Sequence, residues 1–269
     1  GGVMQAAGPV AQAISEIAWL LHIGGALILL GVMGLLAWAV RQQSLRLRPA
    51  LWIAVGGVVF PGMVLTALFI YLLPHGVGSK PVPPPGALVI SVNARMWWWE
   101  VRYPAEGVHG TFTTANEIRI PAGRPVYLAL SSQDVIHSFW VPQLAGKMDM
   151  VPGRLQHLLL SASQPGVYRG QCAEFCGQQH ALMALHVVAQ EPAAFDAWRA
   201  AQAGPAAPSA NVRGQQVFTA NRCDACHTVR GVTGDNRLGP DLTHVGGRMF
   251  IAAGTLPTSA DTLARWGGE

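Results

Sequence analysis

Charge is scarce in this chain. Only 12% of its 269 residues are Asp, Glu, Lys or Arg, against roughly 25% in an average soluble domain. This deficit predicts membrane segments, and the length leaves room for two small domains beside them. The net charge of +4 is spread thinly, and its densest group is Arg41, Arg46 and Arg48. Because no basic face is concentrated enough for a phosphate footprint, we expect no nucleic-acid partner.

Two long stretches carry no formal charge at all, Ile17–Val40 and Leu51–Leu73. As helices each would reach about 35 Å at about 1.5 Å per residue, enough to cross a hydrocarbon core of about 30 Å. The loop between them is short and purely basic, so the positive-inside rule places it in the cytoplasm and the rest of the chain outside. We expect an N-terminal segment over 1–13 and a transmembrane hairpin over 14–75. The alternative is a buried helical hairpin of a soluble protein.

The amino-acid composition of the chain changes twice after this hairpin. Residues 76–86 are rich in proline and predict a stiff linker. Runs rich in β-branched and aromatic residues follow, broken by Gly and Pro, and predict a β-sandwich or barrel over 87–203. An Ala- and Pro-rich stretch then opens a last segment, 204–269.

Cysteine is also scarce, with four in the whole chain. Two of them, Cys172 and Cys176, stand beside His180 and Met183 in "CAEFCGQQHALM". A disulfide and a zinc site are both open alternatives, but neither accounts for a nearby thioether, which suits copper. His137, in "DVIHSFWVP", is the expected further nitrogen ligand. We therefore favour a copper electron-transfer centre with two thiolates.

The same run resembles the binuclear copper A motif of cytochrome c oxidase subunit II, C-x-E-x-C-x3-H-x2-M. "DVIHSFWVPQLAGKMDMVPGRLQ" is similar to the first-histidine segment of that family, and "MWWWEVRY" to its aromatic strand, although Met96 stands where Gln is common. The resemblance implies a cupredoxin β-barrel behind a two-helix anchor. It also implies a role for each matching residue. The implied copper A ligands are the bridging Cys172 and Cys176, the terminal His137 and His180, the weak ligand Met183 and the backbone carbonyl of Glu174. The Glu174 carboxylate would face a magnesium ion at the boundary with subunit I, and electrons would enter through Trp97, Trp98 and Trp99.

The other two cysteines lie in "CDACH", as Cys223 and Cys226 followed by His227. This run is the haem c attachment signature, in which the thiols bind the haem and the histidine becomes an iron ligand. A thioredoxin-like or zinc CxxC pair is the alternative. The surroundings resemble a class I cytochrome c, which implies a small all-α domain whose Pro240 carbonyl accepts the His227 N–H. Met249 comes too early for the second iron ligand, so we expect a chain truncated at its C-terminus.

A copper A domain fused to a cytochrome c domain resembles subunit II of caa3-type oxidases. The resemblance implies a subunit of an enzyme, passing electrons from a c-type cytochrome or respiratory-complex donor to a haem–copper partner that reduces O2 to water. The implied partners are subunit I, further oxidase subunits and membrane lipid. The implied location is a bacterial plasma membrane, with both cofactor domains on the outer face. The alternatives are the copper A subunit of a nitric oxide reductase and a membrane-anchored copper-binding or delivery protein.

Overall fold

The computed structural model describes residues 4–42, 48–75, 81–104, 110–208 and 211–268. They form two compact units, one of Ala13–Ser79 and one of Gly1–Gln12 with Lys80–Glu269. Arg46, residues 1–3 of the expected N-terminal segment and residues 76–80 of the expected linker lie outside the described residues.

The first unit contains the two apolar helices that the sequence predicts. The first is α1 (Pro9–Arg41), and the second runs continuously through α2 (Pro49–Trp52), η1 (Ile53–Val59), α3 (Phe60–Leu72) and η2 (Leu73–His75). The segment η1 is a π-helical turn, and the Phe60 N–H that follows it donates to the Val55 carbonyl, five residues back. Pro61 explains this widening, because its ring lacks an N–H and crowds the preceding turn of an α-helix.

Neither helix has a buried apolar face within its unit. Both are long and apolar enough to cross a membrane, and the apolar windows that satisfy this test are 0% buried. Leu30, Ile53 and Leu65 are each about two-thirds exposed. Side chains of this kind on every side of a helix indicate apolar surroundings outside the chain itself.

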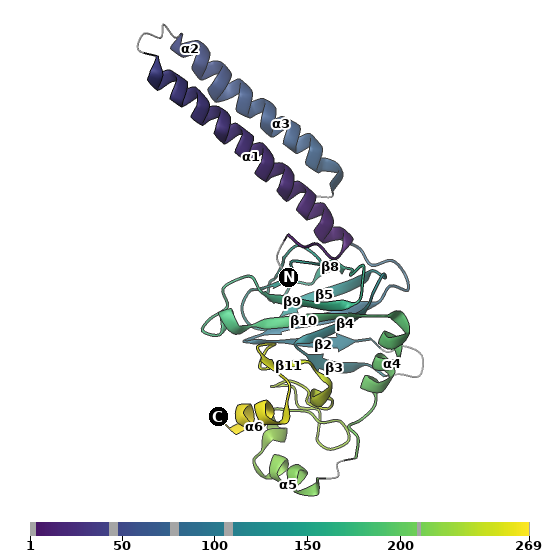
Figure 1. Ribbon diagram of the computed structural model, residues 1–269. Coiled ribbons are helices and arrows are strands. Elements are labelled where there is room, and N and C mark those ends of the chain that lie inside the picture. The colour runs from purple at the N-terminus through teal and green to yellow at the C-terminus, as the bar shows by residue number, and fades with distance from the viewer. Residues whose placement is uncertain (1–3, 43–47, 76–80, 105–109, 209–210, 269) are drawn as a thin grey trace. The chain divides into compact units, whose positions relative to one another are not determined.

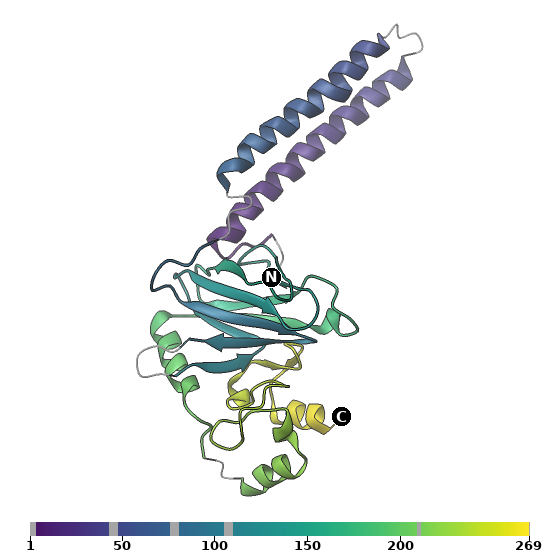
Figure 2. The same ribbon diagram turned by 180° about the vertical axis from the view of Figure 1, so that it is seen from behind.

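The second unit is built around two five-stranded sheets, in the predicted region (Figures 1 and 2). The first sheet has the order β3 (Phe112–Ala115), β2 (Trp98–Tyr103), β1 (Val89–Arg95), β5 (Val126–Ser132) and β8 (Gln156–Leu160). The second has the order β4 (Glu117–Pro121), β10 (Ala184–Gln190), β9 (Gly166–Cys172), β6 (His137–Trp140) and β7 (Met148–Met150). Two pairs, β1 with β5 and β4 with β10, are parallel, and the other pairs are antiparallel.

The core lies between these sheets. Alternate residues of β1 and β9 are buried, as the period of two in a half-buried strand requires. The inward side chains of both sheets form one cluster that includes Ile90, Leu128, Phe139 and Val187. The site described below is built on the second sheet and on the turn between β1 and β2, so this core holds it.

A helix that the sequence analysis did not predict closes one edge of the sandwich. It is α4 (Pro192–Ala203), which begins with proline in its first turn and buries Phe195. Trp198 packs edge-on against Tyr103, with ring centroids 5.2 Å apart. The helix α4 ends at Ala203, where the sequence analysis expects a domain boundary, and the chain on both sides belongs to one compact unit.

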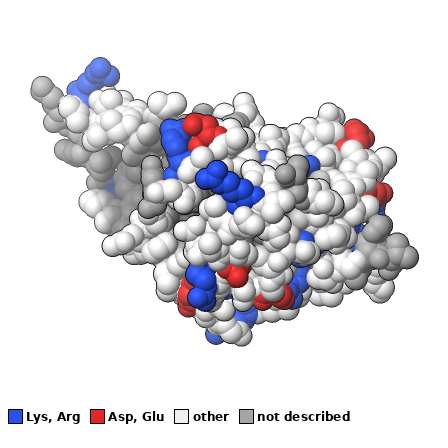
Figure 3. Space-filling model, turned by 90° about the horizontal axis from the view of Figure 1, so that it is seen from below, with Lys and Arg blue, Asp and Glu red and all other residues white. Residues whose placement is uncertain are grey.

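The last segment lies against the sandwich and contains α5 (Val212–Ala220), η4 (Cys223–Ala225), η5 (Val245–Gly247), β11 (Phe250–Ile251), β12 (Leu256–Pro257) and α6 (Ala260–Gly268) (Figures 1 and 2). The expectation of an all-α segment was therefore wrong in one respect, because β11 and β12 form an antiparallel hairpin. The sequence analysis missed it since two-residue strands leave no periodic pattern. Basic and acidic side chains lie interspersed on the face seen from below (Figure 3). Within the last segment, Arg237 pairs with Asp235 at 2.7 Å.

Candidate metal centre and haem-attachment segment

The sulfur and nitrogen side chains expected to bind copper converge at one end of the second sheet. Cys172 is the last residue of β9, and Met183 directly precedes β10. The Cys172 N–H donates to the Met183 carbonyl at 2.9 Å, which closes the loop between these strands. The Ala173 N–H donates to the Ser138 carbonyl, also at 2.9 Å, and so joins the loop to β6. His137, the first residue of β6, therefore lies beside the loop.

The distances within this group connect all five side chains. The two cysteine sulfurs are 3.8 Å apart. The Cys172 Sγ lies 3.8 Å from the His137 Nδ1, and the Cys176 Sγ lies 3.5 Å from the His180 Nδ1. The Met183 Sδ lies 3.9 Å from the Cys176 Sγ. Each sulfur of the central pair thus has its own histidine nitrogen beside it.

The structure argues against the disulfide alternative. Both cysteines are free thiols, and 3.8 Å is far longer than the about 2.05 Å of an S–S bond. The ligand atoms of His137, Cys172 and Cys176 all lie within 4.8 Å of one another, and all three side chains are buried. Two thiols, two imidazoles and a thioether form a soft donor set that fits copper.

Asp134 is a member of the candidate site that the sequence analysis missed. Its Oδ1 lies 2.8 Å from the His137 Nε2. An Nε2–H that donates to this carboxylate leaves the Nδ1 lone pair directed at Cys172, where a metal ligand is needed. An acidic residue three positions before a ligand histidine was the available signal, but sequence alone did not show which way the ring would turn.

The electrostatics of the cysteine pair favour a bound cation. Burial alone would raise the pKa of Cys172, but hydrogen bonds from His137 and from the backbone at Ser138 outweigh burial and lower this pKa. Burial and then the charge on Cys172 raise the pKa of Cys176. The pair therefore ionises once with ease and a second time only with difficulty. A metal ion would supply the positive charge that a second thiolate requires.

The pKa values of His137 and Asp134 are shifted in opposite directions. Burial would lower the pKa of His137, but the contacts with Cys172 and Asp134 outweigh burial and raise it. Burial would raise the pKa of Asp134, but its bonds to His137 and to the Met96 N–H outweigh burial and lower it. This carboxylate therefore stays ionised and holds the imidazole in place.

The three tryptophans do not share one surface. Trp97 is half-buried in the turn between β1 and β2, and its Nε1–H donates to the Cys176 carbonyl at 2.9 Å. Gly177 has φ +113°, and a Cβ there would lie 3.1 Å from the Trp97 ring, so both the turn and the contact favour glycine. Trp98 is half-buried beneath Arg95. The expectation that the whole run forms a surface was wrong for Trp99, which is fully buried because its side chain alternates into the core.

Glu174 is exposed, and its two polar ends face different groups. Its carbonyl oxygen lies 3.1 Å from the Cys172 Sγ, inside the metal centre. Its carboxylate accepts a hydrogen bond from the Phe175 N–H at 3.1 Å. The carbonyl is therefore close to the position expected of a copper ligand, while the magnesium role stays a prediction.

The candidate haem-attachment residues lie on a short turn of the last segment. Cys223 is half-buried, Cys226 is exposed, and both are free thiols. The His227 Nδ1 lies 2.7 Å from the Pro240 carbonyl oxygen, the contact that the resemblance to a class I cytochrome c implies. A Cβ at Gly239 would lie 2.5 Å from the His227 Cε1, so this position has room only for glycine. Accessible thiols and an imidazole oriented through its Nδ1 fit covalent haem c.

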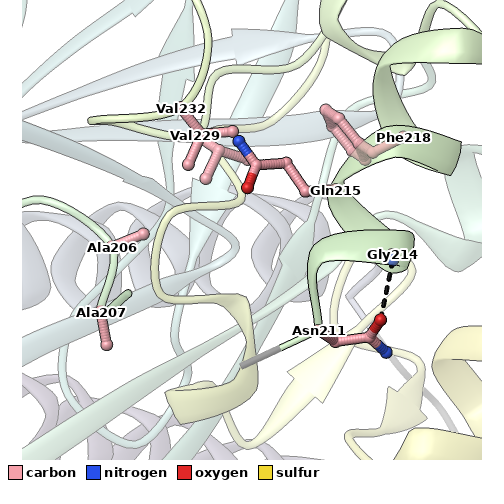
Figure 4. Close-up of a pocket in the computed structure, with 8 residues that line it drawn as sticks. All are labelled: Ala206, Ala207, Asn211, Gly214, Gln215, Phe218, Val229 and Val232. Atoms are coloured by element: carbon pink, nitrogen blue, oxygen red, sulfur yellow. Dashed lines mark hydrogen bonds between the residues drawn. The ribbon is translucent and has the colours of Figure 1, made fainter. Parts of the chain in front are cut away.

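An apolar cavity lies within the last segment (Figure 4). Its volume is about 250 Å³, and Phe218 of α5 lines it together with Val229 and Val232. Asn211 caps α5 at its rim, where the side-chain oxygen accepts from the Gly214 N–H at 2.8 Å. Phe218 precedes the CxxCH run, and Val229 and Val232 follow it, so the cavity is lined by residues close in sequence to the candidate attachment residues.

A two-sheet sandwich that gathers two cysteines, two histidines and a methionine at one end is a domain of the cupredoxin type with a candidate metal centre. Residues 102–190 match the family model of the periplasmic domain of cytochrome c oxidase subunit II. The domain that contains residues 102–190 therefore belongs to the cytochrome c oxidase subunit II family.

The relatives that it matches are longer. The chain is 42% identical over 181 residues to cytochrome c oxidase subunit 2 of Alkalihalophilus pseudofirmus, covering 66% of this chain and 51% of that protein. It is 30% identical over 194 residues to the Bacillus subtilis protein of the same name, covering 67% and 52%. The crystal structure of the periplasmic domain of Bradyrhizobium japonicum cytochrome oxidase subunit II is 28% identical and covers 45% of this chain and 96% of that one, with a TM-score of 0.41. The chain thus spans about half the length of the curated relatives that it matches.

Proposed function

We propose that this chain is the electron-input subunit of a respiratory cytochrome c oxidase. It receives electrons from a c-type cytochrome or respiratory-complex donor and delivers them, by way of haem c and a binuclear copper A centre, to a haem–copper partner that reduces O2 to water. One observation carries the proposal: two thiol sulfurs 3.8 Å apart, each with a different histidine Nδ1 within 3.8 Å.

The proposed copper ligands follow from this arrangement. Cys172 and Cys176 would hold the pair through their thiolates, His137 and His180 would each supply an imidazole nitrogen, and Met183 and the Glu174 carbonyl would complete the set. Copper supplies a reversible one-electron couple there. The chain holds the ligands in place, since the loop that carries them is bonded to β6 and closed on β10. Ligands fixed in this way move little when the charge of the site changes, which favours fast electron transfer.

Haem c is the second proposed cofactor, attached through Cys223 and Cys226. His227 would bind the iron through its Nε2, because its Nδ1 faces the Pro240 carbonyl. The partly exposed thiols are accessible to the attachment chemistry, and the apolar cavity beside Phe218 supports a flat apolar ligand at this place. Trp97 and Trp98 are proposed to lie where electrons enter the copper domain.

The location and partners complete the proposal. The two apolar helices would anchor the chain in a bacterial plasma membrane, in contact with lipid and with subunit I and further oxidase subunits. The basic loop would face the cytoplasm, and the sandwich and last segment the outer side. A magnesium ion bound by the Glu174 carboxylate would lie at the boundary with subunit I.

Co-purification of the full chain from its native membrane tests the proposal. The expected complex contains a large haem–copper subunit, consumes oxygen when a reduced c-type cytochrome is added, and shows the electron paramagnetic resonance signal of one electron shared by two coppers. Consumption of nitric oxide in place of oxygen would identify a nitric oxide reductase. Copper bound without any haem–copper partner would identify a copper-binding or delivery protein.

A further inference from the structure

The hairpin of β11 and β12 packs against the sandwich next to the metal centre. The Ala253 carbonyl, in the turn of the hairpin, accepts a hydrogen bond from the Ala184 N–H at 3.0 Å. Ala184 is the first residue of β10 and is joined by its peptide bond to Met183. The last segment thus touches the residue that follows a proposed copper ligand.

The hairpin supplies a hydrogen-bond acceptor for the Ala184 N–H, which the neighbouring strand of the sheet does not reach. The His186 N–H donates to the Asn116 carbonyl just before β4, whose pairing with β10 begins at Glu117. The Ala184 N–H is two residues earlier and points to the same side of the strand. The described part of β4 does not reach it, so Ala253 supplies the acceptor. This bond prevents the Ala184 N–H from remaining an unpaired buried donor.

Two side chains of β4 anchor the chain just before the hairpin. The buried Glu117 accepts from the Met249 N–H through Oε2 and from the Arg119 Nε through Oε1, both at 2.8 Å. The Arg119 Nη2 donates to the Gly247 carbonyl at 3.0 Å. A buried carboxylate is costly unless it is paired and bonded. If the hairpin left, Glu117 would lose one of these partners, so the docked state is strongly favoured.

The hairpin is shaped for this contact. The Phe250 ring stacks on the buried His186 imidazole, with centroids 3.9 Å apart and planes 10° from parallel. Ala252, Ala253 and Gly254 follow one another at φ +50°, +51° and +76°, a conformation that costs alanine energy. A Cβ at Gly254 would lie 3.2 Å from the Ala184 carbonyl carbon and 3.3 Å from the His186 Nδ1. The close approach therefore requires glycine.

We propose that the hairpin 250–257 is a positioning element for Met183. The hairpin binds the Ala184 N–H on the side of β10 that faces β4. It thereby fixes where the Met183 thioether lies relative to the Cys176 sulfur, 3.9 Å away. A weak thioether ligand tunes the potential of a copper site, so the last segment sets a property of the copper centre in addition to carrying its own attachment site. This inference rests on the proposed copper centre for its electrochemical readout.

The test uses the full chain and four variants. Phe250→Ala removes the stack, and Phe250→Tyr keeps the ring and serves as the rescue. Gly254→Val adds a side chain where the hairpin touches Ala184. Gly246→Ala is the matched control, because a Cβ at Gly246 meets nothing within 4 Å in the same segment. Amide hydrogen exchange at Ala184 is measured without copper, and the copper potential and paramagnetic spectrum are measured after loading.

Phe250→Ala and Gly254→Val are expected to speed exchange at Ala184 roughly tenfold, since they release its hydrogen bond. Both should also shift the copper potential, while Phe250→Tyr and Gly246→Ala match the unmodified chain. Unchanged exchange in Phe250→Ala would overturn the proposal, as would faster exchange with an unaltered potential. If the unmodified chain binds no paired copper, the proposed function fails separately, and the exchange data decide whether the hairpin holds Ala184.

Discussion

The two cysteine pairs of this chain are held in different ways. Cys172 and Cys176 are 3% and 4% exposed and face their partner side chains inside a packed sandwich. Cys223 and Cys226 stand on a short turn of the last segment, one half-buried and one exposed. The first pair is organised by long-range packing between strands. The second is organised by nearby contacts such as His227 with Pro240.

Burial explains this difference. The sandwich has a continuous core, whereas among the described residues after 203 only Ile251 is a buried apolar side chain. A segment with so little apolar burial gains little stability from its own folding. Its order depends on docking against the sandwich and on the group that its thiols would hold. We therefore expect the candidate metal centre to be formed before a metal binds, and the CxxCH segment to become fully ordered only when its proposed ligand is attached.

The largest expected effect comes from breaking the organised pair. Cys172→Ser should reduce the copper content from two ions to at most one per chain and abolish the paired paramagnetic signal, because one sulfur cannot bridge as two do. Mass spectrometry of the metal and paramagnetic resonance measure both. Cys226→Ser is the control and should keep the paired signal. A signal of one isolated copper in the unmodified chain would contradict the assignment.

Removing the second pair tests whether the segment needs its ligand. Cys223→Ala with Cys226→Ala should abolish covalent haem and speed proteolysis within 211–230 by roughly tenfold, since local opening would be favoured. Haem staining of a denaturing gel and timed proteolysis measure the two effects. The copper signal should be unchanged. Haem that stays covalently bound in this variant would show that other groups attach it.

Asp134→Asn sharpens the comparison with a smaller change inside the metal centre. The amide keeps the shape but loses the charge that holds His137, so copper affinity should fall roughly tenfold to a hundredfold. Competition with a copper chelator measures this. Asp149→Asn makes the same charge change on the exposed face of β7 and should leave the affinity at its original value. Equal losses of copper affinity in both variants would show that Asp134 has no specific role in the site.

The smallest expected effect is a pH dependence of the docking of hairpin 250–257 against His186. Burial, followed by the charge of Arg169, lowers the pKa of His186 below its usual 6.5, and Glu117 opposes this. The undocked state therefore binds more protons, and docking weakens as pH falls from 6.5 towards the lower pKa of the docked state. Amide exchange in 249–257, corrected for its intrinsic pH dependence, measures this. His186→Phe keeps the ring without its charge and should show no such dependence.

The sequence was sufficient to predict the features that depend on residues close together in the chain. Two uncharged runs longer than a bilayer predict two apolar helices, and α1 and the helix from Pro49 to Leu72 match them. The C-x3-C and CxxCH spacings identified the candidate ligand and attachment residues, because metal and haem chemistry depends on the types of side chain present. The Pro240 contact followed from the resemblance and is present. All these features lie within short stretches of the chain.

Tertiary structure decided what depends on residues far apart in sequence. Packing between strands turned Trp99 into the core and directed Trp97 at the Cys176 carbonyl. Asp134 is only three residues from His137, but the sequence does not show that the turn before β6 aims its carboxylate at the imidazole. The hairpin that reaches Ala184 joins residues that no short motif connects. Composition and spacing determine which groups a chain can offer, whereas their mutual orientation depends on cooperative burial that no local segment encodes by itself.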